Sequence, residues 1–167
     1  MRQDPPELLA MITQLIGTPS VSSITPDLDQ GNRAVIDLLA GWLDDAGFDV
    51  EVMPLPGEPA RANLIATLGR GPGGLVLSGH TDTVPWDDGD WQHDPFRLTE
   101  ADGRLFGLGT ADMKAFLGLA IEALRDIRPQ DLREPVIILA TADEETSMAG
   151  ARTLVERDAV HARHALI

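Results

Sequence analysis

The stretch VIILATADEETSMAG, residues 136–150, runs from an apolar segment into three consecutive acids and then into a helix-like segment. Its apolar part, 136–142, is short, continuous and aliphatic, which predicts a strand buried inside a sheet. Asp143, Glu144 and Glu145 follow at the end of that strand. Neighbouring like charges repel, so this position needs a physical reason. A buried strand that leads directly into a helix is typical of an α/β fold.

The rest of the chain repeats this alternation of helices and short apolar strands. Helices are predicted over about 5–16, 32–45, 113–127 and 147–157. Strands are predicted over 48–55, 63–69, 74–79 and 164–167. Residues 96–107 have the pattern of a hairpin that turns near Asp102-Gly103. Asp4 is the expected N-cap of the first helix, and Leu119 and Ile127 are among the expected core positions of the third. The sequence therefore predicts an α/β layer fold with a mixed, largely parallel sheet.

Composition narrows the class of protein. The 167 residues, of which 43% are hydrophobic, suffice for one globular domain with a sizeable core. The formal net charge of -14 disfavours nucleic acid and anionic membrane surfaces as partners. The sequence has no cysteine, so a metal site has to use His, Asp or Glu. The N-terminal segment has the pattern of neither a signal peptide nor a membrane span, and a cytoplasmic location is expected.

Polar residues that can carry chemistry follow the predicted strands. LVLSGHTDTVP, residues 75–85, puts His80 and Asp82 just after a strand, and LGTADMK, residues 108–114, puts Asp112 at the start of a helix. Glu144 and Glu145 follow another strand. In open α/β sheets, ligands gather at the carboxyl ends of the strands. These five side chains are therefore expected near one edge of the sheet.

Each of these residues also has a purely structural explanation. His80 and Asp82 can make loop hydrogen bonds, Asp112 can cap a helix, and Glu144 and Glu145 can be acids in the first turn of the next helix. Separate caps need not converge, however, whereas a divalent cation would offset the repulsion between converging carboxylates. A histidine combined with aspartate and glutamate suits zinc or a similar ion.

The pattern supports a two-metal hydrolase. One aspartate can bridge two ions about 3.5 Å apart, and a carboxylate that binds no metal can act as general base. Glu144 and Glu145 can divide the tasks of base and ligand, but their spacing does not say which does which. His93 is expected in a surface loop, and His161 and His164 are not expected to be ligands.

Together, SGHTDTVP, LGTADMK and TADEET resemble the M20 family of metallopeptidases and deacylases. The resemblance implies a three-layer, zinc-exopeptidase-like catalytic domain with two divalent metal ions, zinc or cobalt. It implies that His80 binds one metal, Asp112 bridges both and Glu145 binds the second. It further implies that Glu144 is the general base and that Asp82 orients His80.

The implied reaction is hydrolysis of a linear amide bond in a small N-acyl amino acid by a metal-bridging water. A desuccinylase or a peptidase of the same family is the nearest alternative. A metal-binding module without catalysis is an alternative from another class of protein.

The resemblance also implies that residues 1–167 are the N-terminal portion of the catalytic domain. Family members are more than twice as long, with further metal ligands expected beyond Ile167. A dimerisation and lid domain, through which a homodimer is expected to form, is absent from these residues, as are the C-terminal catalytic strands. We therefore expect the 167 residues alone to bind zinc weakly and to hydrolyse no substrate measurably.

Overall fold

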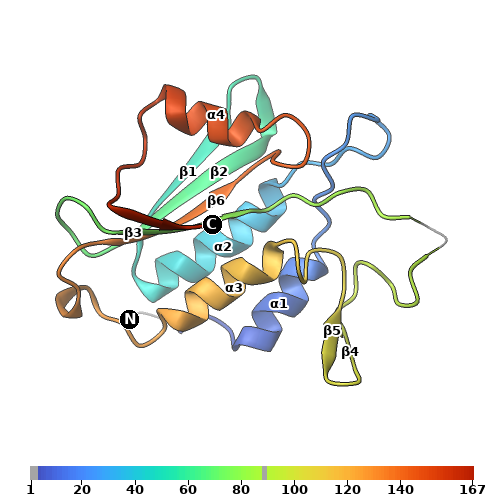
Figure 1. The fold of residues 1–167 in the computed structure, drawn as a ribbon, viewed down its shortest axis with the longest axis horizontal. Helices are drawn as coiled ribbons and strands as arrows, with labels where there is room; N and C mark the ends of the chain where they lie inside the picture. Colours follow the sequence, from blue (N-terminus) through green and yellow to red (C-terminus); the bar gives the residue numbers. More distant parts are fainter. Residues whose placement is uncertain (1–3, 88–89) are drawn as a thin grey trace.

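The computed structural model describes residues 4–87 and 90–167 as a sheet with helices on both faces (Figure 1). The helices are α1 (Leu8–Ile16), α2 (Arg33–Ala46), α3 (Lys114–Ala123) and α4 (Ala149–Glu156), with a 3-10 turn, η1, at Pro129–Asp131. The strands are β1 (Asp49–Leu55), β2 (Glu58–Leu68), β3 (Leu75–His80), β4 (Thr99–Ala101), β5 (Arg104–Phe106), β6 (Val136–Thr141) and β7 (His164–Leu166).

The main sheet is mixed, as predicted. Its strand order is β1-β2-β6-β3-β7. β1 pairs antiparallel with β2, and β2 pairs antiparallel with β6. β3 pairs in parallel with both β6 and β7. The antiparallel pairing of β1 with β2 follows from their short connection, where Gly57 has a φ of 80°, because a tight turn can join only antiparallel strands. The parallel half contains β3 and β6, whose carboxyl ends lie at one edge.

Helices cover both faces of this sheet, which makes three layers (Figure 1). On one side, Leu39 of α2 and Leu117 of α3 pack with Leu64 and Ile138 of the sheet in a large apolar core. On the other side, Leu154 of α4 belongs to a smaller core, whose strand members are Met53, Ile65, Val76 and Ile137. Neighbouring strand residues such as Leu64 and Ile65 enter different cores because successive side chains point to opposite faces. The layered fold is the one expected from the sequence.

Three predicted helices are shorter than expected, including the fourth, which spans only Ala149–Glu156. The first begins at Leu8 with Glu7 as its N-cap, so the prediction for Asp4 is wrong. Pro5 and Pro6 precede this helix, and their carbonyls accept hydrogen bonds from Arg125 at 2.8 and 2.7 Å. The third helix ends at Ala123 and continues only as turns, and Ile127 beyond it is exposed instead of in the core. Leu119 lies within the helix but on its solvent-facing side, so the core prediction for this residue is also wrong.

The hairpin is formed as predicted by β4 and β5, and it stands apart from the main sheet (Figure 1). Asp102 and Gly103 at its turn have φ values of 51° and 68°. Positive φ at both central residues is the backbone of a tight hairpin turn, which Asp-Gly sequences favour.

The junction between β6 and α4 is closed by the side chain of Asn63. Its amide oxygen accepts the N–H of Ala142 at 3.1 Å, and its amide nitrogen donates to the carbonyl of Gly150 at 2.9 Å. Gly150 in turn donates its N–H to the carbonyl of Ala142 at 3.2 Å. These bonds hold the start of α4 against the end of β6, so that residues 143–148 form a short closed loop.

We predict that Gly150→Ala lowers the free energy of unfolding by about 1–3 kcal/mol, because the close approach at this junction leaves no room for a methyl group. A Cβ atom at Gly150 would lie 2.4 Å from the carbonyl oxygen of Ala142 and 2.5 Å from the amide oxygen of Asn63. Gly41→Ala in α2 is the control, since a Cβ there meets nothing within 4 Å and should raise stability by up to about 1 kcal/mol. Urea unfolding measures both variants, and equal stability of the two would contradict the prediction.

Candidate metal centre

The three segments singled out in the sequence meet at one edge of the sheet. His80 is the last residue of β3, and its register partner on β6 is Thr141. Glu144 and Glu145 follow β6 after two further residues, and Asp112 directly precedes the N-cap of α3. Since β3 and β6 are parallel neighbours, their carboxyl ends lie side by side, which explains why segments distant in sequence converge.

The imidazole of His80 is buried and has a defined orientation. Its Nδ1 lies 2.9 Å from the main-chain carbonyl of Asp82. A carbonyl oxygen can only accept, so Nδ1 carries the hydrogen. The other nitrogen, Nε2, lies 3.0 Å from Oδ1 of Asp112 and 3.8 Å from Oε2 of Glu144. A neutral ring would therefore aim its Nε2 lone pair at carboxylates, which is favourable only with a proton or a cation between them.

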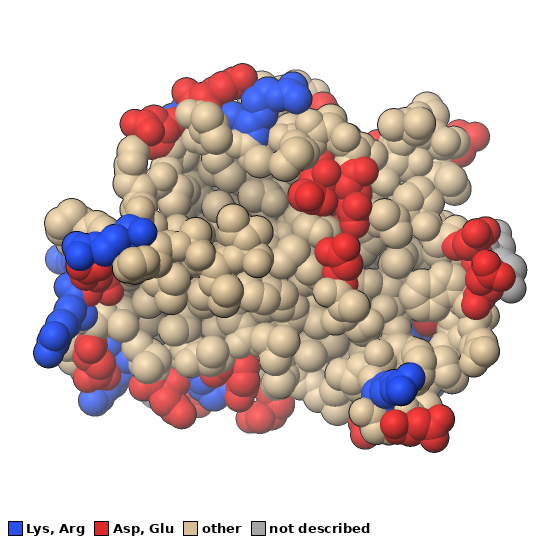
Figure 2. All heavy atoms as spheres, viewed as in Figure 1, with Lys and Arg blue, Asp and Glu red and all other residues tan. Residues whose placement is uncertain are grey.

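The carboxylates around the imidazole of His80 lie close enough together to bind a common metal ion. One atom each of His80, Glu144 and Glu145 lies within 4.8 Å of the others. The side chain of Asp112 is 75% exposed beside this group, with its oxygen next to Nε2. Acidic side chains gather beside a hollow on the face seen in Figure 2. A hollow of about 770 Å³ has His80, Asp112 and Glu144 in its wall and continues along α4.

Asp82 joins the two loops of this site. Its carbonyl holds His80, and Oδ2 of its carboxylate accepts the N–H of Glu145 at 3.0 Å. Its second oxygen, Oδ1, is buried 3.7 Å from Nδ1 of His80 and has no hydrogen-bond partner among the residues that the structure describes. The expected contact with the far side of the imidazole is thus made by the main chain of Asp82. Its side chain instead fixes the loop of residues 143–148, the acid loop.

Helix capping does not account for the acids. The first turn of α4 begins at Ala149 after the N-cap Met148 and contains no acid, so Glu144 and Glu145 lie in the preceding loop. The N-cap of α3 is Met113, not Asp112. The structural explanations for these three residues are therefore wrong, and their convergence on His80 needs another one.

Comparison with known proteins agrees with this geometry. Residues 76–167, more than half of the chain, match the sequence pattern of Peptidase family M20/M25/M40. The chain belongs to the M20 family.

Relatives of this M20 chain carry the name acetylornithine deacetylase. It is 54% identical over 162 residues to the proteins of that name from Proteus mirabilis (strain HI4320) and Salmonella newport (strain SL254). Each alignment covers 97% of this chain and 42% of the relative, so the chain spans less than half the length of these curated relatives.

Among solved structures, human carnosine dipeptidase 1 superposes with a TM-score of 0.70 at 26% identity, covering 90% of this chain and 35% of that one. A tripeptidase from Staphylococcus aureus has a TM-score of 0.68 at 23% identity and covers 95% of this chain and 41% of that one. The second likeness concerns the fold alone. Both are consistent with the α/β architecture predicted from the sequence.

The other three histidines lie outside the centre of this M20 chain. The ring of His93 packs on Phe106 with 4.8 Å between ring centroids. His161 and His164 are exposed near the C-terminal end of the chain. None of the three joins a metal-ligating group in the part of the chain that the structure describes.

The charges around His80 shift the pKa values of the centre. Burial alone would lower the pKa of His80, but the negative charge of Asp82 and the hydrogen bond to Asp112 together raise it. Burial raises the pKa of Glu145, and the charges of Asp112 and Glu144 add to that effect while His80 opposes it. Nearby carboxylates contribute to both shifts, so negative charge accumulates at this site. A cation bound between the carboxylates would stabilise the arrangement.

Several residues that hold the centre are not evident from the sequence. Lys114 is buried at the start of α3 and donates to the carbonyl of Thr18 at 2.6 Å, and burial lowers its pKa to about 8. Ser22 and Arg61 contact Asp143, which precedes the two glutamates. Their partners lie far away along the chain, so no local spacing could reveal them.

No helix among the described residues is long and apolar enough to cross a membrane.

We predict that Asp112→Asn lowers the pKa of His80 in the metal-free chain, because the substitution removes a negative charge 3.0 Å from Nε2. An NMR titration of the His80 ring protons measures this. Because the folded-state pKa of His80 is raised, its contribution to stability is complete below about pH 6.5 and is lost as the pH rises through the folded-state pKa.

Asp158→Asn is the matched control for this titration. It removes a carboxylate 3.3 Å from another ring nitrogen, that of His161 at the surface, and should leave the pKa of His80 unchanged. An unchanged pKa of His80 in Asp112→Asn would show that the two side chains do not meet in solution.

Proposed function

We propose that this chain carries the metal centre of a metal-dependent amide hydrolase. We further propose that the whole protein converts N2-acetylornithine to ornithine and acetate, a step of arginine biosynthesis in the cytoplasm. The observation that carries the proposal is the convergence of Asp112, Glu144 and Glu145 on Nε2 of His80 in an M20 chain. The 54% identity to proteins named acetylornithine deacetylase supports the choice of substrate.

The donor set fits two divalent cations. Since Nδ1 of His80 carries its hydrogen, the lone pair of Nε2 is free to bind a metal. His80 and Asp112 would hold one ion, and Asp112 and Glu145 would hold the other. An imidazole with carboxylates suits zinc best, with cobalt as an alternative. Bound ions would polarise the amide carbonyl and make water a stronger nucleophile near neutral pH.

Glu144 is proposed as the general base. Its side chain is 43% exposed, so it can reach a water and a substrate, and its Oε2 lies near Nε2 of His80. The main chain of the neighbouring Glu145 is instead bonded to Asp82, which suits a fixed ligand. Glu144 would take a proton from the attacking water and pass it to the leaving amine nitrogen. The C–N bond breaks, the hydroxyl stays with the acetyl carbon, and an amine and a carboxylate result.

Asp82 is proposed to orient the imidazole during this reaction. Its carbonyl fixes the hydrogen on Nδ1, and its carboxylate fixes the main chain of Glu145. A hydrogen bond to the far side of a ligating histidine raises the basicity of the metal-binding nitrogen. Asp82 would thus fix the positions of His80 and of the loop that carries Glu144 and Glu145 relative to each other.

A peptidase or a succinyl-diaminopimelate desuccinylase is the nearest alternative within the family. The similarity to human carnosine dipeptidase 1 supports a peptide as the alternative substrate. A metal-binding module is the alternative for the 167 residues alone, because this donor set gives each ion two protein ligands where a catalytic zinc site typically has three. Metal binding without turnover would support the module.

We predict that the chain binds zinc weakly and that His80→Ala and Glu145→Gln each reduce zinc affinity by 10-fold or more, on the order of the loss of one ligand. Glu144→Gln should keep zinc affinity within about 3-fold, since a base is not a ligand. Isothermal titration calorimetry measures all four proteins. A larger loss in Glu144→Gln than in Glu145→Gln would exchange the proposed roles of the two residues.

Turnover is tested separately. The zinc-loaded 167-residue chain should hydrolyse no N2-acetylornithine measurably, and turnover there would overturn this expectation. A protein extended to the length of the relatives should hydrolyse it faster than succinyl-diaminopimelate or a dipeptide. In that longer protein Glu144→Gln should lower kcat by about 100- to 10,000-fold with little change in KM. Faster turnover of either competing substrate would contradict the assignment.

A further inference from the structure

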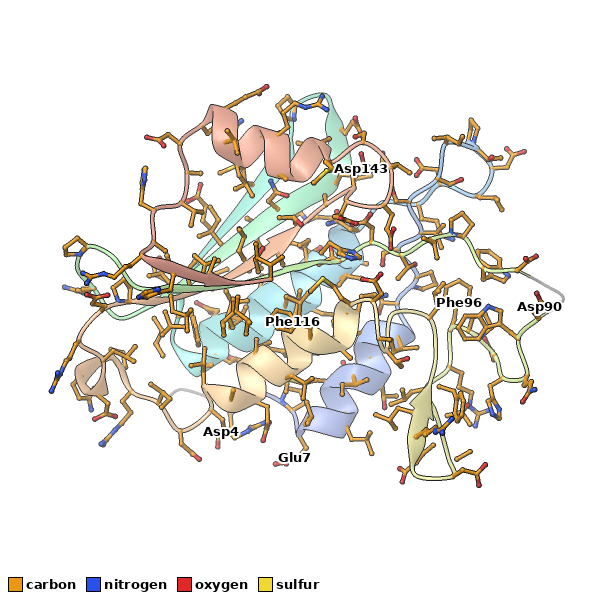
Figure 3. The ribbon with its side chains drawn as sticks, in the orientation of Figure 1. Asp4, Glu7, Asp90, Phe96, Phe116 and Asp143 are labelled. Carbon is orange, nitrogen blue, oxygen red and sulfur yellow. The ribbon has the colours of Figure 1, made fainter. Side chains whose placement is uncertain are left out.

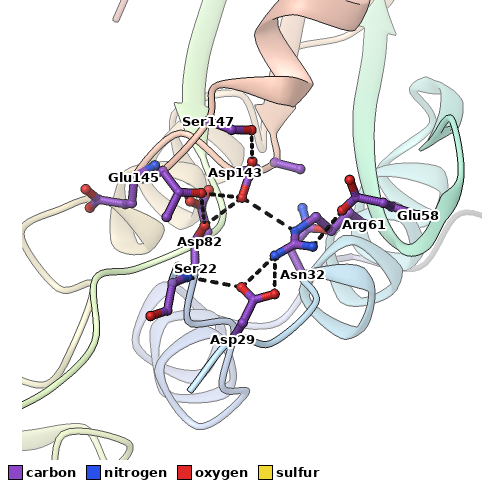
Figure 4. Close-up of polar contacts among 12 residues, drawn as sticks. Ser22, Asp29, Asn32, Glu58, Arg61, Asp82, Asp143, Glu145 and Ser147 are labelled. Atoms are coloured by element: carbon purple, nitrogen blue, oxygen red, sulfur yellow. Dashed lines mark hydrogen bonds and ion pairs between the residues drawn. The ribbon is translucent and has the colours of Figure 1, made fainter. Parts of the chain in front are cut away.

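The loop that carries Glu144 and Glu145 is anchored by the residue before them. Asp143 is buried, and its Oδ1 accepts hydrogen bonds from Ser22 at 2.7 Å and from Thr146 at 2.6 Å (Figure 4). Its Oδ2 accepts a hydrogen bond from Ser147. The main-chain carbonyl of Asp143 accepts the N–H of Met148 at 2.6 Å and closes the loop. Asp143 lies where β6 gives way to this loop, beside α4 (Figure 3).

Arg61 of β2 provides positive charge to this anchor. Its Nε lies 3.6 Å from Oδ1 of Asp143. Its Nη2 donates to both carboxylate oxygens of Asp29 at 2.6 and 2.7 Å, and its Nη1 donates to Glu58 at 2.6 Å. The side chain of Arg61 is only 17% exposed, and the planar guanidinium directs each of its three nitrogens toward a different carboxylate. One cation therefore joins the acid loop to the segment around Asp29.

Ser22 connects this network to the loop of His80. Its N–H donates to the carbonyl of Thr83 at 2.9 Å, and Thr83 donates its N–H to Ser20 at 3.1 Å. Its hydroxyl lies 2.7 Å from Oδ1 of Asp143. The main chain of Ser22 thus holds the segment that contains Asp82, while its side chain holds the acid loop. The network spans two of the three segments that carry the proposed metal ligands, those of His80 and of Glu145.

The charges explain why such an anchor is needed. Three hydroxyl groups, those of Ser22, Thr146 and Ser147, donate hydrogen bonds to the carboxylate of Asp143, and the guanidinium of Arg61 lies beside it. These contacts stabilise negative charge on Asp143, directly beside Glu144 and Glu145. Without Arg61, this loop and Asp29 would repel each other, and the loop would relax toward solvent.

We infer that Ser22, Arg61 and Asp143 are positioning residues of the metal centre, which set the separation of Glu144 and Glu145 from His80. Arg61 touches no proposed ligand and acts through Asp143. This inference rests on the proposed metal centre. It predicts that the affinity for metal depends on a guanidinium that binds no metal.

The test compares Arg61→Met with Arg125→Met in the 167-residue chain. Arg125 is a matched control because its side chain is also 17% exposed, and it too binds a carboxylate, that of Glu122. Arg125 follows the C-terminal end of α3, and Asp112 precedes the N-terminal end of the same helix. Because α3 has 10 residues and is about 15 Å long, the length of the helix separates Arg125 from the proposed metal ligand Asp112. Both variants lose contacts of similar kind and should lose comparable thermal stability.

Only Arg61→Met should weaken zinc binding, by about 10- to 100-fold in calorimetry, as expected for a residue that supports the ligands. It should also change the visible absorption spectrum of bound Co²⁺ and speed amide hydrogen exchange over residues 144–148. Arg61→Lys should recover part of the zinc affinity, because it keeps the charge but not the planar guanidinium.

Unchanged zinc affinity in Arg61→Met, or an equal loss in Arg125→Met, would overturn the inference. Absence of zinc binding by the unsubstituted chain would overturn the proposed metal centre instead. In that case, hydrogen exchange over 144–148 still decides whether Arg61 fixes the loop, since this readout needs no metal. Faster exchange in Arg61→Met alone would support the anchoring, and equal exchange in both variants would contradict it.

Discussion

The parallel pairing of β3 with β6 is the constraint on which the site depends. It fixes two strand ends side by side, so that His80 and the loop after Thr141 leave the sheet at the same edge. The carbonyl of Asp82 then orients the ring of His80, and the carboxylate of Asp82 holds Glu145. A sheet in which these strands were separated by another would keep the same residues but lose their convergence on His80.

The edge produced by this pairing carries more negative charge than protein groups neutralise locally. Three carboxylates, of Asp112, Glu144 and Glu145, lie close to the imidazole of His80, and two more, of Asp82 and Asp143, are buried beside them. The buried and the exposed carboxylates have different surroundings. Arg61 and hydroxyl donors stabilise the buried carboxylate of Asp143, whereas Asp112 and Glu144 line the open hollow. The buried carboxylate is thereby a fixed support, and the exposed carboxylates stay available for chemistry.

Much of the fold and of the proposed metal centre could be predicted from the sequence. The apolar strands were evident from short aliphatic runs, and His80, Asp112, Glu144 and Glu145 from their places after strands or before a helix. The first five residues of β2, Glu-Pro-Ala-Arg-Ala from Glu58, were missed because they contain a proline and no β-branched or aromatic residue, a composition that does not indicate a strand. The contact of Ser22 with Asp143 spans 121 positions, so it depends on the tertiary fold and leaves no local pattern.

The closed loop between β6 and α4 has a consequence for how this protein can vary. Its ends are tied twice, by Met148 to Asp143 and by Gly150 to Ala142. An inserted or deleted residue would break one of these ties and rotate both glutamates away from His80. The proposed roles of Asp143, Glu144 and Glu145 constrain the side chains of this loop, and the two ties constrain its length as well. Among homologous chains, this segment should therefore reject gaps even where neighbouring surface turns, such as that of the β4–β5 hairpin, accept them.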